Sequence, residues 1–257
     1  MRAVIILSLV TCASSCAPDR RETDRSSSTD LQTSVRLHDH ALVVHLVAAA
    51  GHATGPLILY VTGDGGWAGD QTLFSRMIPW GYPMAGISAA DYVSHLDPPG
   101  TVEPHQIADD YRAIIDAARQ ALKLGRDTRV VLVGLSRGSG LDVAAAGDPH
   151  LQSSLKGVLA IALTGEEEYV EERGRPGTKG VMLQTYEALP RLGNLPIAVI
   201  QSTRDQYLPA DEARRRFGPD APGRRFRAID AADHGFGGKL SELYREMKAG
   251  FDWIVGG

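Results

Sequence analysis

Short apolar runs alternate along the chain with longer segments in which apolar residues recur at helical spacing. Runs of the first kind predict buried strands, and periodic segments predict helices with one face in the core. The strand candidates are 34–37, 41–47, 56–61, 82–87, 130–135, 157–163, 196–202 and 225–229. The helix candidates are 70–78, 104–124, 138–146, 210–217 and 240–254. In the segment 104–124, the apolar stripe is typical of a helix that packs on a core.

Strands that alternate with helices favour an α/β fold with a mostly parallel central sheet and helices on both faces. The chain of 257 residues suits one such domain, and we expect it to span 35–257. The charged and Gly/Pro-rich segment 165–190 interrupts the alternation between two strands. This insertion suits a lid over a site at the sheet edge, or a solvated loop without a role.

The amino terminus differs from the rest of the chain. Residues 1–16 begin with Met1-Arg2, continue with an apolar run and end in small residues, as in a signal peptide of an exported protein. Ala13-Ser14-Ser15-Cys16 is similar to a bacterial lipobox, which makes Cys16 the candidate for lipidation and the membrane surface a candidate partner. Residues 17–34 are polar and predict a flexible tether. We therefore expect a periplasmic protein, either free or lipid-anchored.

Composition excludes several other classes. The net charge of −4 comes from 27 basic and 31 acidic residues, so nucleic-acid binding has no support. Both cysteines, Cys12 and Cys16, lie in the predicted signal, which leaves no disulfide framework for the domain. No cluster of residues has the spacing of metal ligands, and we expect neither a metal nor an organic cofactor. The sequence carries no signal for an oligomeric state.

The clearest chemical motif is Gly134-Leu135-Ser136-Arg137-Gly138, which follows an apolar strand and precedes a helix. In that context, G-x-S-x-G predicts the nucleophile elbow of an α/β-hydrolase fold, with the hydroxyl of Ser136 above the sheet edge. The flanking glycines are needed because a Cβ would collide with a neighbouring strand or helix. A strand–helix turn that happens to contain serine is the alternative.

A serine hydroxyl needs a base and a group that orients the base, and this scaffold orders them as Ser, acid, His along the chain. His234 follows the last predicted strand and is the best base, whereas His150 suits a surface turn. Asp205 follows the strand 196–202 and is the best acid. Its rivals are Asp211, Asp230 and Asp233.

Backbone amides that stabilise an oxyanion are expected from two places. One is Arg137, directly after the nucleophile, and the other is the glycine-rich loop after strand 56–61. The substrate-facing candidates in that loop are Asp64, Gly65, Gly66 and Trp67. A phosphate-binding P-loop is excluded because no Lys-Ser/Thr pair follows the glycines.

Together, Gly63-Asp64-Gly65-Gly66-Trp67 and the later serine elbow resemble the VirJ/AcvB family of exported bacterial α/β-hydrolases. The similarity runs from about residue 56 to 253 and includes Pro104 to Asp109, similar to that family's Pro-x-x-x-Ala-Asp helix start. Two positions depart from the family pattern. Arg137 stands where members tend to have Phe, and His234-Gly235-Phe236 stands where they tend to have His-His-Phe.

The resemblance implies that a carboxylic ester of an aminoacylated phospholipid, such as lysyl-phosphatidylglycerol, is cleaved in the periplasm. Asp64 is the candidate to pair with an ammonium group of that substrate. Two alternatives stay open. One is a general periplasmic carboxylesterase acting on small-molecule esters, and the other is a non-catalytic scaffold for envelope or secretion partners.

Overall fold

A computed structural model describes residues 31–38, 40–94, 104–168 and 182–257. The predicted signal 1–16, including Cys16, and most of the predicted tether lie outside the described residues. The tether prediction differs from the structure at its end, because strand β1 (Leu31–Leu37) already includes residues 31–34. Along β1, less exposed side chains alternate with exposed ones from Thr33 to Leu37, and the strand pairs with β2 (His40–Val47) as an edge hairpin.

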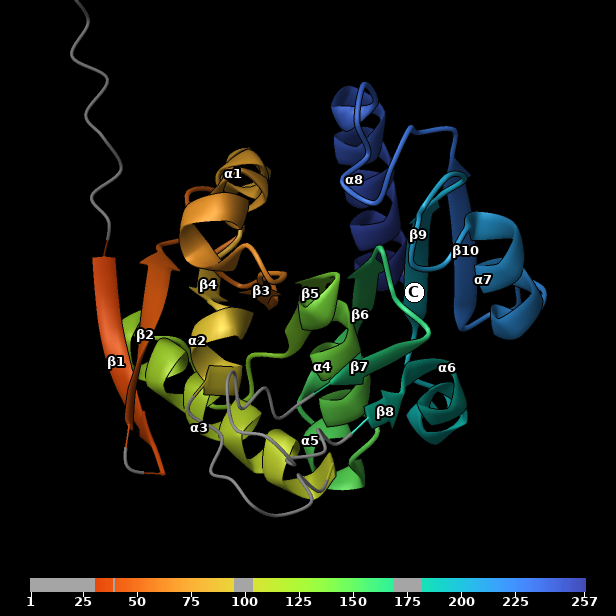
Figure 1. Cartoon of the computed structure of the whole chain (residues 1–257). Coiled ribbons are helices and arrows are strands. Elements are labelled where there is room, and N and C mark those ends of the chain that lie inside the picture. The colour runs from red at the N-terminus through yellow and green to blue at the C-terminus, as the bar shows by residue number, and fades with distance from the viewer. Residues whose placement is uncertain (1–30, 39, 95–103, 169–181) are drawn as a thin grey trace, which may run out of the picture.

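Eight strands form one sheet in the order β1-β2-β4-β3-β5-β6-β9-β10 (Figure 1). The antiparallel pairs are β1–β2 and β2–β4, and every other pair is parallel. The remaining strands of this sheet are β3 (Leu57–Val61), β4 (Met84–Ile87), β5 (Val130–Leu135), β6 (Leu155–Ile161), β9 (Ile197–Ser202) and β10 (Arg224–Ile229). The predicted α/β fold with a mostly parallel sheet is confirmed.

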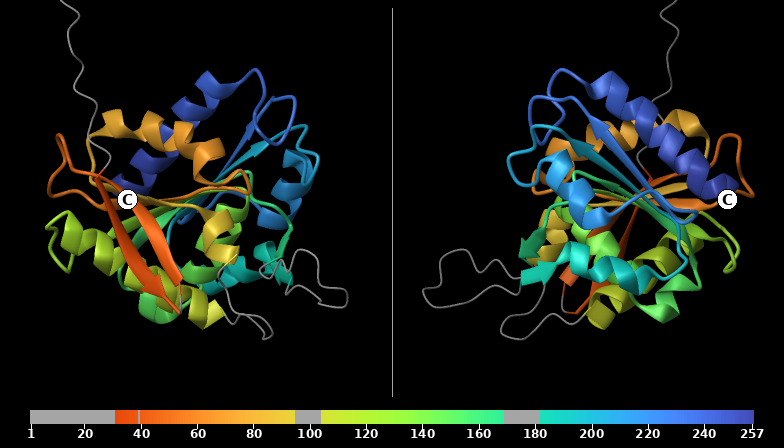
Figure 2. Two further views of the ribbon diagram at one scale, coloured as in Figure 1. Left: turned by 60° about the vertical axis from the view of Figure 1, so that its left-hand side comes forward. Right: turned by 90° about the vertical axis from the view of Figure 1, so that its right-hand side faces the viewer.

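Helices cover both faces of the sheet (Figure 2). The helices are α1 (Gly66–Met77), α2 (Ala89–Ser94), α3 (Pro104–Ala121), α4 (Arg137–Ala146), α5 (Pro149–Gln152), α6 (Thr185–Ala188), α7 (Ala210–Phe217) and α8 (Leu240–Gly256), with short 3-10 turns at Ile78–Trp80 and Leu189–Leu192. All five helices expected from sequence are present, and α7 has the predicted bounds. No helix in the described part of the chain is long and apolar enough to cross a bilayer.

The core divides into two clusters, one on each face of the sheet. In β3, Leu57, Leu59 and Val61 join the cluster with α3 and α4, whereas Ile58 and Tyr60 join the cluster with α1 and α8. A strand buried on both faces reads as a continuous apolar run, because neither set of alternate side chains meets water. This burial fixes the positions of the strand ends, and the predicted site residues follow those ends.

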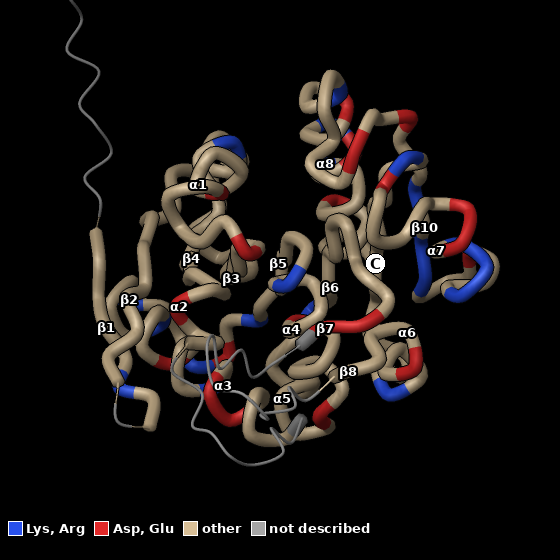
Figure 3. The backbone as a smooth tube through the Cα atoms, viewed as in Figure 1, with Lys and Arg blue, Asp and Glu red and all other residues tan. Residues whose placement is uncertain are grey.

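The sheet edge at β10 carries arginines (blue in Figure 3). Charged side chains on an edge strand discourage pairing with another chain. Two of these arginines are held locally, since Arg224 lies over the ring of Phe217 and Arg225 lies over the ring of Trp253.

The predicted insertion 165–190 lies outside the main sheet. Its described parts form the two-stranded ribbon β7 (Glu166–Glu168) and β8 (Met182–Gln184), followed by α6 and a 3-10 turn. Residues 169–181, the middle of the predicted lid, lie outside the described residues. The ribbon lies beside the amino-terminal half of α4, next to the sheet edge where the serine elbow is (Figure 1).

Candidate active site

Ser136 occupies the sharp turn between β5 and α4. Its backbone is in a strained region, with φ of 51° and ψ of −117°, which is costly for a residue with a Cβ. The turn is possible because its flanking residues are glycines. A Cβ on Gly134 would lie 2.4 Å from the Ser139 nitrogen, and one on Gly138 would lie 2.2 Å from the Val61 carbonyl oxygen. The predicted elbow geometry is therefore present.

Neighbouring strands hold the elbow in place. The amide of Ser136 donates to the carbonyl oxygen of Ile161 in β6 at 2.8 Å. The buried hydroxyl of Ser139 accepts the Ile161 amide at 2.9 Å and lies 2.7 Å from the Gly134 carbonyl oxygen. A strained turn persists only where surrounding contacts stabilise it, and these hydrogen bonds provide that stabilisation. No motif in the sequence predicted this role for Ser139.

The structure brings Ser136, His234 and Asp205 into one line. Nε2 of His234 lies 2.8 Å from Oγ of Ser136, and Nδ1 lies 2.7 Å from Oδ2 of Asp205. A carboxylate only accepts, so Nδ1 carries the proton and Nε2 is left to accept from the serine hydroxyl. All three residues follow parallel strands (β5, β9 and β10) at their carboxyl ends, where this class of sheet gathers its polar groups.

Asp205 is held in place by hydrogen-bond donors on both of its oxygens. It is only 1% exposed, and its Oδ1 accepts the amides of Tyr207 at 2.8 Å and Leu208 at 3.3 Å. Its Oδ2 accepts from Nε2 of Gln201 at 2.9 Å in addition to the imidazole. Each oxygen thus accepts two hydrogen bonds, which fixes the carboxylate beside the imidazole.

The rival residues from sequence lie in other settings. Asp233 points back to its own turn, where it accepts the Gly237 amide at 2.9 Å. Asp230 pairs with Arg204 and Thr203, and Asp211 accepts an amide in the first turn of α7. His150 lies in α5, which is capped by Asp148.

His234 stands on a short loop that is anchored in the core. Phe236, two residues on, is fully buried and has a positive φ of 58°. The His234 amide donates to Oε1 of Gln206 at 3.1 Å, and the Tyr207 ring packs edge-on against the imidazole at 4.8 Å between centroids. These contacts fix the imidazole between its two partners.

The glycine-rich loop after β3 approaches the elbow closely. A Cβ on Gly63 would lie 3.3 Å from the Cβ of Ser136, so a larger residue there would push the neighbouring atoms aside by a few tenths of an ångström. The Gly63 amide is not available to an oxyanion, because it donates to Oδ2 of Asp70 at 2.8 Å. The Asp64 amide donates to no residue in the described part of the chain. The Gly65 amide likewise donates to no described residue, so these two loop amides are the candidates to bind an oxyanion together with the Arg137 amide.

Asp70 was not predicted as part of the site. It lines the pocket from α1, and burial raises the pKa of its carboxyl group. Its bond to the Gly63 amide fixes the orientation of the glycine-rich loop. Its place at the first residue of a predicted helix gave no sign of this contact.

Two of the predicted substrate-facing residues lie elsewhere. Trp67 turns into α1, stacks on His45 at 3.6 Å between ring centroids, and fills the space beside Gly86. Gly66 has a positive φ of 61° and starts the same helix, with its amide bonded to the Gly63 carbonyl oxygen. The helix starts earlier than expected, at Gly66, and that early start carries both residues away from the pocket.

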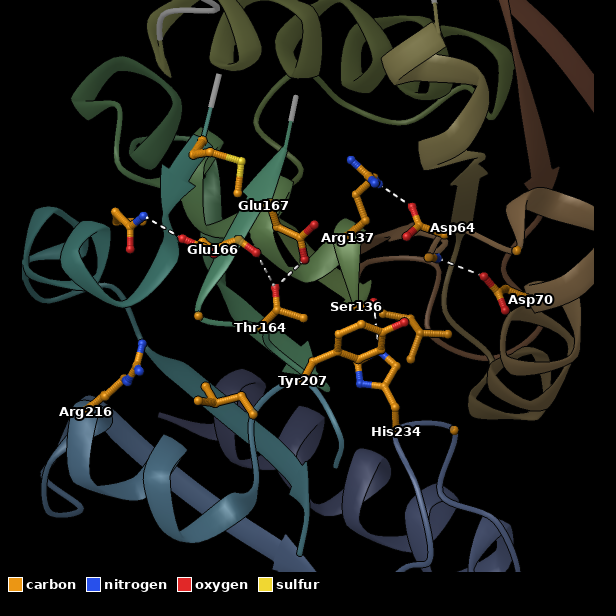
Figure 4. Close-up of a pocket in the computed structure, with 18 residues that line it drawn as sticks. Asp64, Asp70, Ser136, Arg137, Thr164, Glu166, Glu167, Tyr207, Arg216 and His234 are labelled. Carbon is orange, nitrogen blue, oxygen red and sulfur yellow. Dashed lines mark hydrogen bonds and ion pairs between the residues drawn. The ribbon is translucent and has the colours of Figure 1, made fainter. Parts of the chain in front are cut away.

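Asp64 keeps its place at the pocket but has a partner. Its carboxylate forms an ion pair with the Arg137 guanidinium (Figure 4). Asp64 is 65% exposed at its side chain, whereas Arg137 is 12% exposed. Asp64 is therefore a weaker candidate to bind a cationic substrate, because Arg137 already offsets its charge.

A pocket of about 770 Å³ opens above Ser136 and His234. The loop after β3 forms one wall, and the β7–β8 ribbon forms another (Figure 4). Lining residues that the sequence did not predict include Thr164, Glu167, Met182, Gln184, Tyr207 and Arg216. Thr164 follows β6, and the others come from the insertion and the segment after β9, none of which has a motif that could identify them. Among the described residues, no group of His, Cys, Asp and Glu could hold a metal ion.

Comparisons with known proteins agree with this architecture. The family model described as bacterial virulence protein (VirJ) matches residues 55–201. No curated protein matches the sequence. Among solved structures, Est1E from Butyrivibrio proteoclasticus is similar with a TM-score of 0.64 and 10% identity, over 88% of this chain and 99% of that chain.

Two further solved structures resemble the chain. Naproxen esterase (carboxylesterase NP) from Bacillus subtilis has a TM-score of 0.61 and 11% identity, over 86% of this chain and 91% of that chain. The a/b serine hydrolase without lid, XC6422 from Xanthomonas campestris, has a TM-score of 0.58 and 14% identity, over 88% and 94%. At such identities these likenesses establish the α/β-hydrolase fold alone.

Proposed function

The chain belongs to the VirJ family of bacterial virulence proteins, and on that premise we propose that it is a serine hydrolase that cleaves carboxylic esters. The observation that carries the proposal is the line of hydrogen bonds from Ser136 through His234 to Asp205. A non-catalytic scaffold has no need for a strained serine with a correctly polarised imidazole beside it. The esterases and serine hydrolases of similar fold support the same reaction class.

In the proposed reaction, Ser136 Oγ attacks the ester carbonyl while Nε2 of His234 takes the hydroxyl proton. Asp205 keeps the imidazole in the required tautomer and stabilises the imidazolium that forms. The amides of Arg137 and of Asp64 or Gly65 donate to the oxyanion. The imidazolium then protonates the leaving alcohol, and water, activated by the same imidazole, releases the acyl group from the serine.

We propose an aminoacylated phospholipid, such as lysyl-phosphatidylglycerol, as the substrate. Membership of the family supports this choice, as does a pocket whose wall contains the acidic residues Asp64, Asp70, Glu166 and Glu167. The signal-like segment 1–16 supports export to the periplasm with Cys16 as the lipid-bearing residue, which would hold the enzyme at the membrane surface. A general carboxylesterase uses the same chemistry on smaller esters.

Hydrolysis of p-nitrophenyl acetate by the purified protein tests the reaction class. We expect turnover by the wild type and its loss in Ser136→Ala, down to residual catalysis roughly 10³-fold or more below the wild type. Equal rates for both proteins would contradict the proposal. Incubation with a bacterial lipid extract tests the substrate, because only the aminoacylated phospholipids should disappear. A periplasmic fractionation of wild type and Cys16→Ser tests the anchor.

A further inference from the structure

Glu167 is a buried acidic residue of the pocket whose chemistry the proposed reaction does not use. It projects from β7 into the pocket wall (Figure 4) yet is only 7% exposed. Among the described residues, the Thr164 hydroxyl is its single hydrogen-bond donor, and it bonds to Oε1. Burial raises the pKa of the Glu167 carboxyl group, while the Thr164 hydroxyl and the nearby Arg137 guanidinium act in the opposite direction.

Space for this carboxylate is built into the serine helix. A Cβ on Gly140 would lie 2.5 Å from Cγ of Glu167, so the glycine leaves room that any larger residue would fill. Gly140 is one helical turn beyond the nucleophile, since its amide bonds to the Ser136 carbonyl oxygen at 3.2 Å. One turn of helix is about 5.4 Å, which places Glu167 within reach of a group attached to an ester held at Ser136.

The other acidic residues of the pocket are tied to other parts of the structure or are exposed. Asp64 is paired with Arg137, and Asp70, which also has a single donor among the described residues, uses it to hold the loop after β3 through the Gly63 amide. Glu166 is exposed and accepts from Nε2 of Gln184 at 3.0 Å. A buried carboxylate with one donor is costly unless a ligand supplies more, and a cationic donor supplies both charge and hydrogen bonds.

We propose that Glu167 determines substrate specificity by binding a protonated amine of the ester. The ammonium replaces the missing donors at Oε2 and pairs with the carboxylate where little water competes. Glu167 thereby takes the role first expected of Asp64. This inference rests on the proposed ester hydrolysis and adds to it the residue that recognises the cationic part of the substrate.

Matched esters with and without an amine test the proposal. In the acyl half, p-nitrophenyl 6-aminohexanoate is compared with p-nitrophenyl hexanoate, and in the alcohol half, 6-aminohexyl acetate is compared with hexyl acetate. Wild type should prefer the amine in at least one pair, and that pair shows which half of the ester carries it. In Glu167→Gln, kcat/KM for the preferred amine ester should fall about 10- to 100-fold, as expected for a lost charge-assisted bond, and the neutral ester should be little changed.

Glu187→Gln is the control, because it removes the same charge from an exposed glutamate of the same insertion that does not line the pocket. It should change the preference for the amine by about twofold or less. Wild type without a preference in either pair, or an unchanged preference in Glu167→Gln, would overturn the assignment. Failure of the proposed hydrolysis differs from both, since no ester of either pair would then be cleaved.

A second measurement uses the wild type alone and holds even where Glu167→Gln fails to fold. Hexylammonium should inhibit the hydrolysis of p-nitrophenyl acetate at concentrations about tenfold below those of hexanol, because only the cation can pair with the carboxylate. Equal inhibition by the two compounds would contradict the binding of an amine in this pocket.

Discussion

Replacement of Asp205 by Asn tests how the imidazole is held. Both carboxylate oxygens accept two bonds, Oδ1 from the amides of Tyr207 and Leu208, and Oδ2 from His234 and Gln201. An asparagine has one accepting oxygen and one donating NH₂ group. Two of the four donors must therefore face another donor, in whichever orientation the amide adopts.

The imidazole can adapt and the peptide amides cannot. Peptide N–H groups that face NH₂ would each be left unsatisfied at a cost of about 1–3 kcal/mol, so the asparagine oxygen should stay on Tyr207 and Leu208. Its NH₂ group then donates to Nδ1 of His234, and the ring proton moves to Nε2. An Nε2 that carries a proton cannot accept one from Ser136.

We therefore expect Asp205→Asn to lower kcat on p-nitrophenyl acetate by about 10⁴-fold, as in serine proteases with the equivalent change, which corresponds to about 5.4 kcal/mol. Asp233→Asn is the control, because Asp233 is next to His234 in sequence but bonds to Gly237. It should retain activity within about twofold. A folded Asp205→Asn protein with more than about a tenth of wild-type kcat would refute the reasoning.

Three further predictions concern stability, measured by urea unfolding. Ser136→Gly should be about 1 kcal/mol more stable than Ser136→Ala, because only glycine relieves the positive φ; equal stability would contradict the strain. Gly138→Ala should lose about 3 kcal/mol because its Cβ meets the Val61 carbonyl oxygen at 2.2 Å, whereas Gly69→Ala, with open space around it, should lose nothing. Burial raises the pKa of Asp142 well above its ordinary value, so the folded state keeps a proton that the unfolded state releases. Wild-type stability relative to Asp142→Asn should thus fall above about pH 4, by up to about 1.4 kcal/mol per pH unit, and a difference independent of pH would contradict this.

The fold and the three aligned residues could be predicted because they depend on local signals. A strand buried on both faces is an unbroken apolar run, as in β3 and β5, and the elbow requires glycine at fixed positions beside the serine. The order of Ser136, Asp205 and His234 follows from where parallel strands end. Such signals can be recognised within short stretches of sequence.

The pocket wall could not be predicted because it depends on contacts between distant segments. Asp64 meets Arg137 across 73 positions of sequence, and that contact alters what its charge can bind. Trp67 follows the glycines directly, yet the start of α1 at Gly66 turns it toward His45. Glu167 has no motif, and its position depends on a missing side chain at Gly140. Only packing in three dimensions decides these cases.

The central claim is that His234 activates the hydroxyl of Ser136. A fluorophosphonate probe reacts covalently with a serine activated in this way. Intact-mass measurement after incubation should show one phosphonyl group on the wild type, mapped to the peptide that contains Ser136, and none on Ser136→Ala. A wild-type protein that stays unlabelled, or carries the label on another residue, would contradict the account.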